Sequence, residues 1–342
     1  MFILDLEKPH SLLQAEACDR RLARNHIKRP DLELKLRNLI SGHQGEKTLH
    51  YFLSLFPKDK FQIYHGLRLP IGNSFFQIDG LLVTSKIIFV LESKNNAGIL
   101  TIDKHQLTQQ YNENSETYQN PVAQVTRHKI LLKYFLDEYK FPAIPMEDLV
   151  VITRSSTELR ITQGYTEGHK KVCKAEDLLK ELHRFEKFNY KESFDKQAIN
   201  RLRHLLLKKH TPLIVNISEE LGIERSEILT GVSCPNCKTL KMDYYRKEWK
   251  CSECLLYSKD AFIEAINDYF LLIKPTITNA ELREFLRLPS QRAATYILSI
   301  LKLHSTGQNK GRVYHQPKLF PISVSHVFPN QSNTNKNKIG GP

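Results

Sequence analysis

Phe76–Lys94 reads Phe-Gln-Ile-Asp-Gly-Leu-Leu-Val-Thr-Ser-Lys-Ile-Ile-Phe-Val-Leu-Glu-Ser-Lys, and this stretch decides the fold. Two runs of apolar, β-branched and aromatic residues flank a short polar segment, and this pattern predicts a β-hairpin. The charged residues within the two runs are Asp79, Glu92 and Lys94. The predicted hairpin is therefore apolar apart from one small set of ionisable side chains.

The register of this hairpin decides whether the charged side chains meet. A two-residue turn at Ser85-Lys86 places Asp79 opposite Glu92. Directly opposed residues share a face of the sheet, with their Cβ atoms roughly 5 Å apart. Lys94 points to the same side as Glu92 because side chains alternate along a strand. A register shift of one residue would separate the two carboxylates.

The group of two carboxylates and one ammonium favours a cation site. Close carboxylates repel each other, and burial raises their pKa values unless a cation lies between them. A hard divalent ion such as Mg²⁺ or Mn²⁺ prefers oxygen ligands and suits this position. Lys94 beside the ion would orient or activate a water and stabilise charge on a phosphoryl group. The alternative is an Asp at one strand end and a surface Glu–Lys pair, because Glu-x-Lys alone is a common sequence.

The order of several short motifs adds a family resemblance to this interpretation. The Asp-x(n)-Glu-x-Lys arrangement resembles the PD-(D/E)XK nuclease superfamily. The motifs that accompany it are, in order, Gly45-Glu46, Gln77-Ile78-Asp79, Glu92-Ser93-Lys94-Asn95, Gly98 and Asn120-Pro121-Val122-x-Gln124. Over residues 42–154 this series resembles the nuclease-related domain (NERD) family. The resemblance implies a restriction-endonuclease-like α/β fold, which is a mixed sheet flanked by helices, and a metal-dependent nuclease activity.

The resemblance also implies roles for individual residues. The implied catalytic residues are Glu46, Asp79, Glu92, Lys94 and Gln124. Asp79 and Glu92 are expected to hold Mg²⁺ or Mn²⁺, together with the Ser93 carbonyl, while Lys94 positions the hydrolytic water and Glu46 supports the metal or the water.

Two of these residues have a plain structural alternative. Glu46 lies in the first turn of an amphipathic helix expected to begin at Gly45, where an acid suits the helix dipole. Gln124 lies near the start of a second helix, which Asn120-Pro121 begins as N-cap and first helical residue. There a glutamine can simply face solvent.

Four cysteines form the second strong motif. Cys234-Pro-Asn-Cys237 and Cys251-Ser-Glu-Cys254 are separated by a segment whose alternation predicts a β-hairpin. Two such knuckles joined by a hairpin supply four thiolates for tetrahedral Zn²⁺, and the spacing matches a zinc ribbon. The two alternatives are less favoured, because a redox pair needs only one Cys-x-x-Cys unit and disulfides are disfavoured in the cytoplasm. We expect structural zinc, because no ligand position is left open for catalysis. Cys18 and Cys173 are expected to be ordinary thiols.

The positive charge of the chain is concentrated near its C-terminus. The net charge is +13 over 342 residues, and no acidic residue follows Glu284. A basic, acid-free stretch favours a polyanionic partner, nucleic acid before membrane, although solubility alone also accounts for it. Helices expected over 261–273, 278–286 and 290–301 fit a helix-turn-helix followed by a wing. The residues expected to contact nucleic acid are Arg287, Gln291, Arg292, Lys310 and Arg312. The alternative is a small helical bundle that packs on the ribbon.

The remaining segments complete the expected domain organisation. We expect N-terminal packing helices over 1–41, a nuclease-like domain over 42–155, a helical linker over 156–230, a zinc ribbon over 231–257, a helix-turn-helix or winged-helix-like module over 258–325 and a disordered tail over 326–342. Separate helices are expected over 9–28, 31–40 and 218–229, the last capped by Ser218, and a strand over 149–153 is expected to close the sheet. The charged N-terminus shows no signal peptide, and no apolar run has the length of a membrane span, so a cytoplasmic protein is expected.

These features favour a metal-dependent nuclease that hydrolyses phosphodiester bonds in nucleic acid, with DNA as the expected partner and DNA processing as the expected role. The alternative is a non-catalytic DNA-binding protein that uses a nuclease fold and a zinc ribbon.

Overall fold

The computed structural model describes residues 1–57, 59–186, 188 and 190–329. The chain forms two compact units. One comprises residues 1–9 and 37–214, and the other comprises residues 10–36 together with the chain from residue 215 onward. We call them the sheet unit and the helical unit. Residues 10–36 thus pack with the C-terminal part of the chain, whereas residues 1–9 and 37–41 belong to the sheet unit. The segment 1–41, expected as one N-terminal domain, is therefore divided between the two units.

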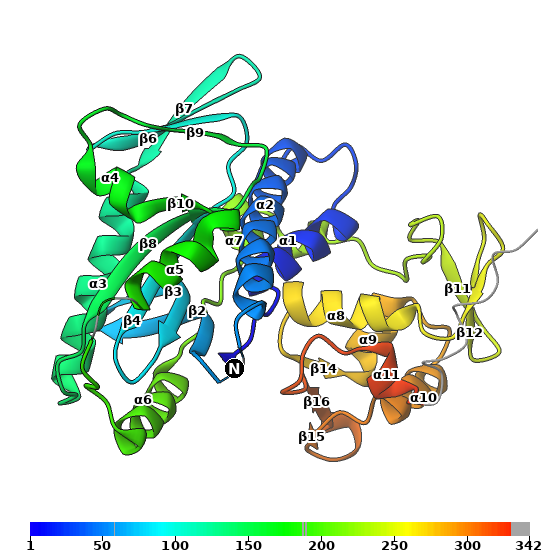
Figure 1. Cartoon of the computed structure of the whole chain (residues 1–342). Helices are drawn as coiled ribbons and strands as arrows, with labels where there is room; N and C mark the ends of the chain where they lie inside the picture. Colours follow the sequence, from blue (N-terminus) through cyan, green and yellow to red (C-terminus); the bar gives the residue numbers. More distant parts are fainter. Residues whose placement is uncertain (58, 187, 189, 330–342) are drawn as a thin grey trace, which may run out of the picture. The chain divides into compact units, whose positions relative to one another are not determined.

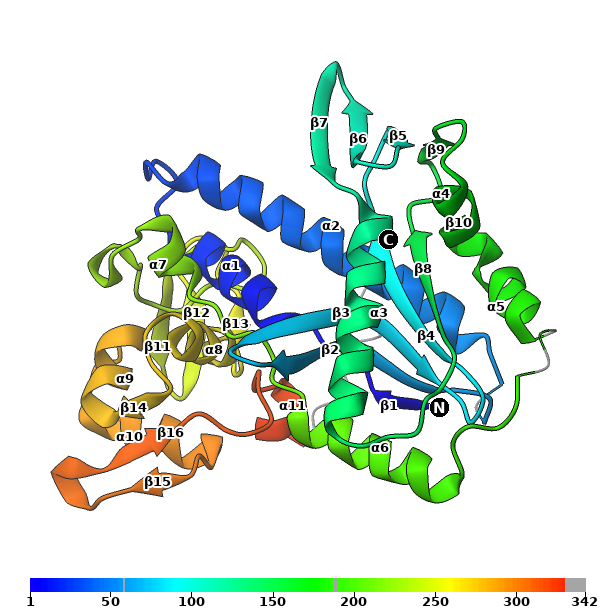
Figure 2. The ribbon, with the colours of Figure 1, turned by 90° about the vertical axis from the view of Figure 1, so that its left-hand side faces the viewer.

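A six-stranded sheet forms the centre of the sheet unit (Figures 1 and 2). Its strands, in spatial order, are β1 (Phe2–Leu4), β2 (Gln62–Ile71), β3 (Ser74–Val83), β4 (Ile88–Lys94), β8 (Met146–Ile152) and β10 (Val172–Lys174). β2, β3 and β4 are antiparallel neighbours, whereas β1, β8 and β10 each join the sheet in parallel. The expected mixed sheet is confirmed. The strand expected to close the sheet is β8, but this prediction is wrong because β10 pairs beyond it.

The hairpin of β3 and β4 has the register that the sequence predicts. Val83 pairs with Ile88 and Gly80 pairs with Leu91, across a two-residue turn at Ser85-Lys86. The pairing ends there, and the same register continued by one residue brings Asp79 opposite Glu92. β-Branched and aromatic residues fit the pleated, buried surface of these strands.

Helices cover both faces of this sheet (Figure 2). The helices of this unit are α3 (Pro121–Glu138), α4 (Thr166–Lys171), α5 (Leu178–Glu186), α6 (Lys196–Lys209) and the C-terminal part of α2 (Arg29–Ser54). α3 and α6 share one apolar core with the sheet, and α2 and α5 share the other. Asn120 caps α3 by accepting hydrogen bonds from the N–H groups of Val122 and Ala123, as the sequence predicts.

A second, smaller sheet continues from the end of β4. Its strands, in spatial order, are β7 (Asn114–Gln119), β6 (Gln106–Tyr111), β5 (Ile99–Ile102) and β9 (Glu158–Ile161). The hairpin of β6 and β7 extends away from the six-stranded sheet (Figures 1 and 2). Gln109 holds the base of this hairpin against the chain that leaves β4, because its Nε2 donates to the carbonyl of Ala97 over 2.8 Å.

The helix α2 is longer than expected. One continuous helix runs from Arg29 to Ser54, where the sequence predicts separate helices over 31–40 and from Gly45. Pro30 stands at its start, where proline is tolerated because the first N–H groups have no helical partner. Glycine inside a helix costs only about 1 kcal/mol relative to alanine. Gly45 is needed for close packing, since a Cβ there would lie 2.8 Å from Asn95 Cβ and 2.9 Å from Thr153 Oγ1.

The helical unit packs around α1 and α8. Its own helices are α1 (His10–Arg21), α7 (Ile217–Leu221), α8 (Phe262–Leu272), α9 (Asn279–Leu286), α10 (Gln291–Leu301) and α11 (Val324–Val327). The helix expected over 9–28 therefore ends at Arg21. The helix expected over 218–229 is also wrong, because α7 ends at Leu221 and its N-cap is Asn216. The tail expected to be disordered begins inside α11, and its residues 330–342 lie outside the described part of the chain.

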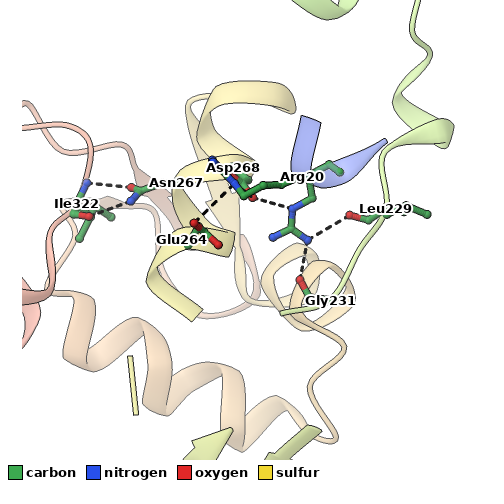
Figure 3. A network of polar contacts seen from close by, with 8 residues as sticks. Arg20, Leu229, Gly231, Glu264, Asn267, Asp268 and Ile322 are labelled. Atoms are coloured by element: carbon green, nitrogen blue, oxygen red, sulfur yellow. Dashed lines mark hydrogen bonds and ion pairs between the residues drawn. The ribbon is translucent and has the colours of Figure 1, made fainter. Parts of the chain in front are cut away.

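A buried ion network joins α1 to α8 (Figure 3). Asp268 is fully buried and accepts hydrogen bonds from Arg20 Nη2 over 2.5 Å and from Arg21 Nε over 2.8 Å. Arg21 Nη1 also donates to the carbonyls of Leu229 and Gly231. One guanidinium therefore ties α1, α8 and the chain before the cysteine motif together.

Two small antiparallel sheets complete the helical unit. One consists of β11 (Met242–Tyr245) and β12 (Glu248–Cys251), which form the hairpin that joins the two cysteine pairs, and β13 (Tyr257–Ser258), which follows the second pair. β14 (Thr276–Thr278), β16 (Val313–His315) and β15 (Ser305–Thr306) form the other, beside α9 and α10. The expected hairpin between the cysteine pairs is confirmed. Across the described residues, no helix has the length and apolar character needed to cross a membrane.

Candidate active site and metal centre

The end of the β3–β4 hairpin brings Asp79 against the backbone of β4. Asp79 Oδ2 accepts hydrogen bonds from the backbone N–H and the side-chain hydroxyl of Ser93, each over 2.9 Å. These two donors fix the carboxylate in one orientation at the point where the strand pairing ends. Glu92 follows Leu91, the last paired residue of β4, and the charge of Asp79 acts on it, so the two acids lie at the same end of the hairpin.

Lys94 connects β4 to α3. Its Nζ donates to Glu92 Oε1 over 2.8 Å and to Gln124 Oε1 over 3.1 Å. Gln124 lies in the first turns of α3, which the Asn120 cap positions over the sheet. The structure therefore brings together Glu92, Lys94 and Gln124, and the solvent-facing alternative for Gln124 does not describe its position.

Glu92 carries the largest electrostatic perturbation at this site. Its side chain is 4% exposed, and His128 Nδ1 on α3 lies 3.7 Å from its Oε2. Burial, together with the charge of Asp79, raises the pKa of Glu92 to about 8, although Lys94 opposes this shift. Burial lowers the pKa of His128. Near neutral pH Glu92 of the metal-free site therefore keeps its proton most of the time.

Glu46 reaches the same site from α2. The close approach of Gly45 to Asn95 and Thr153 brings this part of the helix against the end of β4. Burial, and secondly the charge of Asp79, raises the pKa of Glu46 to about 7. Its Oε2 lies 3.3 Å from His43 Nδ1. Glu46 is mid-helix in α2, so a role in capping a helix start does not apply to it.

The carboxylates of this site suit an ion such as Mg²⁺ that keeps several of its waters, and they do not suit an ion that is fully enclosed by protein ligands. Within the described ranges, the only group of three or more His, Cys, Asp or Glu ligand atoms all within 4.8 Å of one another is that of the four cysteines. Glu46, Asp79 and Glu92 interact electrostatically without reaching that proximity as a trio. Mg²⁺ is usually bound by one or two carboxylates and keeps several waters. The two carboxylates at the end of the hairpin, Asp79 and Glu92, meet that requirement.

A pocket of about 620 Å³ opens beside Asp79, between β3 and α3. Gln124, Arg127 and His128 line it from the helix, and Phe75 and Phe76 line it from the strand. The sequence predicts Gln124 at the site but not His128, which follows one turn later on the same helical face. The i,i+4 spacing of these two residues is the signal that points to it.

The four cysteines form a compact cluster. Cys234 Sγ lies 3.5 Å from Cys254 Sγ, and Cys237 Sγ lies 3.5 Å from Cys251 Sγ. Tetrahedral Zn²⁺ with bonds of about 2.3 Å requires sulfurs about 3.8 Å apart, whereas a disulfide requires about 2.05 Å. Hydrogen bonding from Thr239 lowers the pKa of Cys237 to about 6, which favours the thiolate that a metal needs. The cluster fits a small zinc ribbon.

The residues expected to contact nucleic acid lie on α9, α10 and the strand after them. Gln291 and Arg292 are exposed in the first turn of α10, and Arg312 is exposed before β16. Arg287 ends α9 in a left-handed conformation, and its Nε donates to Thr230 Oγ1 over 2.9 Å. The side chain of Lys310 lies outside the described part of the chain. The helices and the turn between them are as predicted, while contact with nucleic acid stays a prediction.

The comparison with known proteins finds a family match that lies within the sheet unit. Residues 41–153 match the family model described as the nuclease-related domain (NERD). No curated protein and no solved structure matches the chain.

Proposed function

We propose, on the premise that residues 41–153 form a nuclease-related domain, that this protein is a metal-dependent nuclease that hydrolyses phosphodiester bonds in DNA. The observation that carries the proposal is the meeting of Asp79, Glu92 and Lys94 at one end of the β3–β4 hairpin. These are the residues through which the sequence resembles the wider nuclease superfamily.

Each residue has a role that follows from its contacts. Asp79 and Glu92 would hold Mg²⁺ or Mn²⁺, together with the Ser93 carbonyl. When bound, the ion would polarise the scissile phosphate and lower the pKa of bound water. Lys94 is held between Glu92 and Gln124, so its ammonium is positioned to orient a water and to stabilise charge on a phosphate oxygen. Glu46 would support the ion or the water from α2.

The electrostatics of the site support a cation there. Repulsion from Asp79 contributes to the raised pKa of both Glu46 and Glu92. A divalent cation removes that repulsion by stabilising the ionised carboxylates. The protein therefore has a physical reason to bind a cation between these strands.

The helical unit supplies two further parts of the proposed function. Zn²⁺ bound to Cys234, Cys237, Cys251 and Cys254 would stabilise the ribbon. The exposed basic residues of α10 and the following strand, Arg292 and Arg312, would contact DNA phosphates, whose neutralisation supplies most non-specific affinity. A cytoplasmic location, inferred from the sequence, accords with reduced cysteines.

A cleavage assay with and without Mg²⁺, using Asp79→Ala as the inactive control, tests the proposal. Metal-dependent cleavage that this variant loses is the expected result. Cleavage that the variant retains would place the active site elsewhere.

The competing function is a DNA-binding protein with a nuclease fold that does not cut. It is favoured by one observation, that Glu46, Asp79 and Glu92 do not form a three-ligand group among the described residues. DNA binding without metal-dependent cleavage would support it.

A further inference from the structure

The pocket beside Asp79 has a composition that the hydrolytic residues do not explain. One wall is apolar and aromatic, formed by Ile71, Phe75 and Phe76, and Leu131 adds an apolar side chain from α3. Holding a metal ion or a phosphate needs no such wall, because both are hydrophilic. At about 620 Å³, the pocket lies within the range of roughly 300–1,000 Å³ that is typical of small-ligand sites.

Phe75 is the exposed member of this wall. Its side chain is 43% exposed, although it follows a tight turn at the start of a strand. The guanidinium of Arg68 lies 3.9 Å from the ring centroid and covers one ring face. Arg68 is itself held, because its Nη1 donates to the carbonyl of Thr211 over 3.1 Å. Arg68 thus covers one face of the ring, while Phe75 stays partly exposed and lines the pocket.

Polar groups converge on the same space from α3. Lys94 binds Gln124 Oε1, and Gln124 Nε2 has no hydrogen-bond partner among the described residues, so this amide can donate to a ligand. Arg127 lines the pocket, is exposed, and forms no ion pair with any described carboxylate. An aromatic platform, a free amide donor and a free cation are the groups that bind the face of a base, its edge and its phosphate, respectively.

We propose that this pocket binds an unpaired nucleobase next to the scissile phosphate, so that the substrate is single-stranded nucleic acid or a frayed end. The inference rests on the proposed nuclease function, because the phosphate at Asp79 is what places a base beside it. Bases inside a duplex have both faces covered by their neighbours, so they reach such a pocket only after unstacking. Because every base has a π-face, binding here tolerates different sequences.

Binding of bare and base-bearing strands to the full-length, zinc-loaded protein without added Mg²⁺ tests this inference. The ligands are an oligothymidylate of about 12 nucleotides, a length within known single-strand site sizes, an abasic sugar–phosphate strand of equal length, and a blunt duplex. The wild-type protein is expected to bind oligothymidylate on the order of 10-fold more tightly than the abasic strand. It is also expected to bind the single strand more tightly than the duplex.

Phe75→Ala is expected to weaken oligothymidylate binding on the order of 10-fold and to leave abasic binding unchanged. Phe75→Trp should restore binding because it keeps a stacking surface. Tyr134→Ala is the matched control, since Tyr134 is an exposed aromatic residue of α3 that is not part of the pocket. Equal binding of the abasic strand, preference for the duplex, or an unchanged affinity of Phe75→Ala would each overturn the inference.

The outcomes of the binding and cleavage experiments are separable. Phe75-dependent base binding without Mg²⁺-dependent cleavage would keep the pocket assignment and remove the nuclease. Mg²⁺-dependent cleavage with no effect of Phe75→Ala on binding would keep the nuclease assignment and remove the pocket assignment.

Discussion

Ser93 donates both its backbone N–H and its hydroxyl to Asp79 Oδ2, each over 2.9 Å. One oxygen of the carboxylate is therefore fixed by β4, while Asp79 Oδ1 has no hydrogen-bond partner among the described residues. Groups that orient a metal ligand in this way commonly contribute 10- to 100-fold to metal affinity.

Ser93→Ala is expected to lower Mn²⁺ affinity about 10-fold, because it removes one of the two donors to Asp79 and keeps the other. Calorimetric titration of Mn²⁺ into the zinc-loaded protein measures this. Ser115→Ala, in the exposed strand β7, is the matched control and should bind Mn²⁺ as the wild-type protein does. Unchanged affinity in Ser93→Ala would show that Asp79 is not oriented by this hydroxyl.

Asp79→Asn and Lys94→Ala are expected to be equally inactive but opposite in metal affinity. The amide of Asn is an uncharged and weaker ligand for a hard cation, so Asp79→Asn should lose Mn²⁺. Removal of the Lys94 ammonium takes away a positive charge beside Glu92, so Lys94→Ala should retain Mn²⁺ or bind it more tightly while losing hydrolysis. Calorimetry combined with a cleavage assay measures both properties. Full cleavage by Lys94→Ala would remove this residue from the active site.

The raised pKa of Glu92 predicts how stability depends on pH without a divalent cation. The value of about 8 lies above the ordinary value of 4.5, so the folded protein binds more protons than the unfolded chain between these pH values. Stability is then greatest below about pH 4.5 for this group and falls as pH rises toward 8. Each pKa unit corresponds to about 1.4 kcal/mol, so the effect is on the order of a few kcal/mol.

Glu92→Gln is expected to remove most of this loss and to raise the thermal midpoint at pH 8 relative to the wild-type protein. Thermal unfolding at several pH values, in the absence of Mg²⁺ and Mn²⁺, measures the slope. Glu138→Gln changes an exposed carboxylate of α3 and should leave the slope as it is. A wild-type slope in Glu92→Gln would contradict the assignment.

The β3–β4 hairpin was predictable because its information is local. Side chains alternate with a period of two, and a two-residue turn then determines every opposite pair from Val83–Ile88 onward. The same holds for the start of α3, where the Asn120 side chain caps its own helix. The four cysteines were predictable because their spacing is itself the ligand pattern.

The features that were not predicted depend on distant parts of the chain. The close packing of Gly45 in α2 against Asn95 and Thr153 is a contact between distant segments, which no local propensity reveals. The pairing of β10 outside β8 and the packing of residues 10–36 in the helical unit are likewise long-range. His128 approaches Glu92 only because α3 crosses the end of β4.

Removal of zinc is expected to unfold the ribbon over 231–257 and leave the sheet unit folded, because all four ligands lie in that segment. Structural zinc contributes on the order of 10 kcal/mol to such small elements. Trp249, the single tryptophan of the chain, is buried in β12 and reports this change directly. A chelator should therefore shift its emission to longer wavelength.

Cys254→Ser should behave as the chelated protein does, whereas Cys173→Ser, which changes a thiol of β10, should keep the native emission of Trp249. A native emission spectrum in the presence of chelator would refute the ribbon assignment.

The buried network of Arg21 and Asp268 makes the last prediction, which concerns stability alone. Both side chains are fully buried, and Asp268 is the carboxylate that Arg21 and Arg20 share. Asp268→Ala leaves the Arg21 guanidinium buried without a counter-ion, so it should lower the free energy of unfolding by about 3–5 kcal/mol.

Glu264→Gln is the matched control, because its ion pair with Arg20 is 3.8 Å long and partly exposed, and such pairs contribute about 1 kcal/mol or less. The double variant Arg21→Met with Asp268→Leu should recover much of the loss, since apolar pairs often replace buried ion pairs at little cost. Urea unfolding followed by Trp249 fluorescence and by circular dichroism measures all three variants. A loss in Asp268→Ala no larger than that in Glu264→Gln would show that this network does not hold α1 against α8.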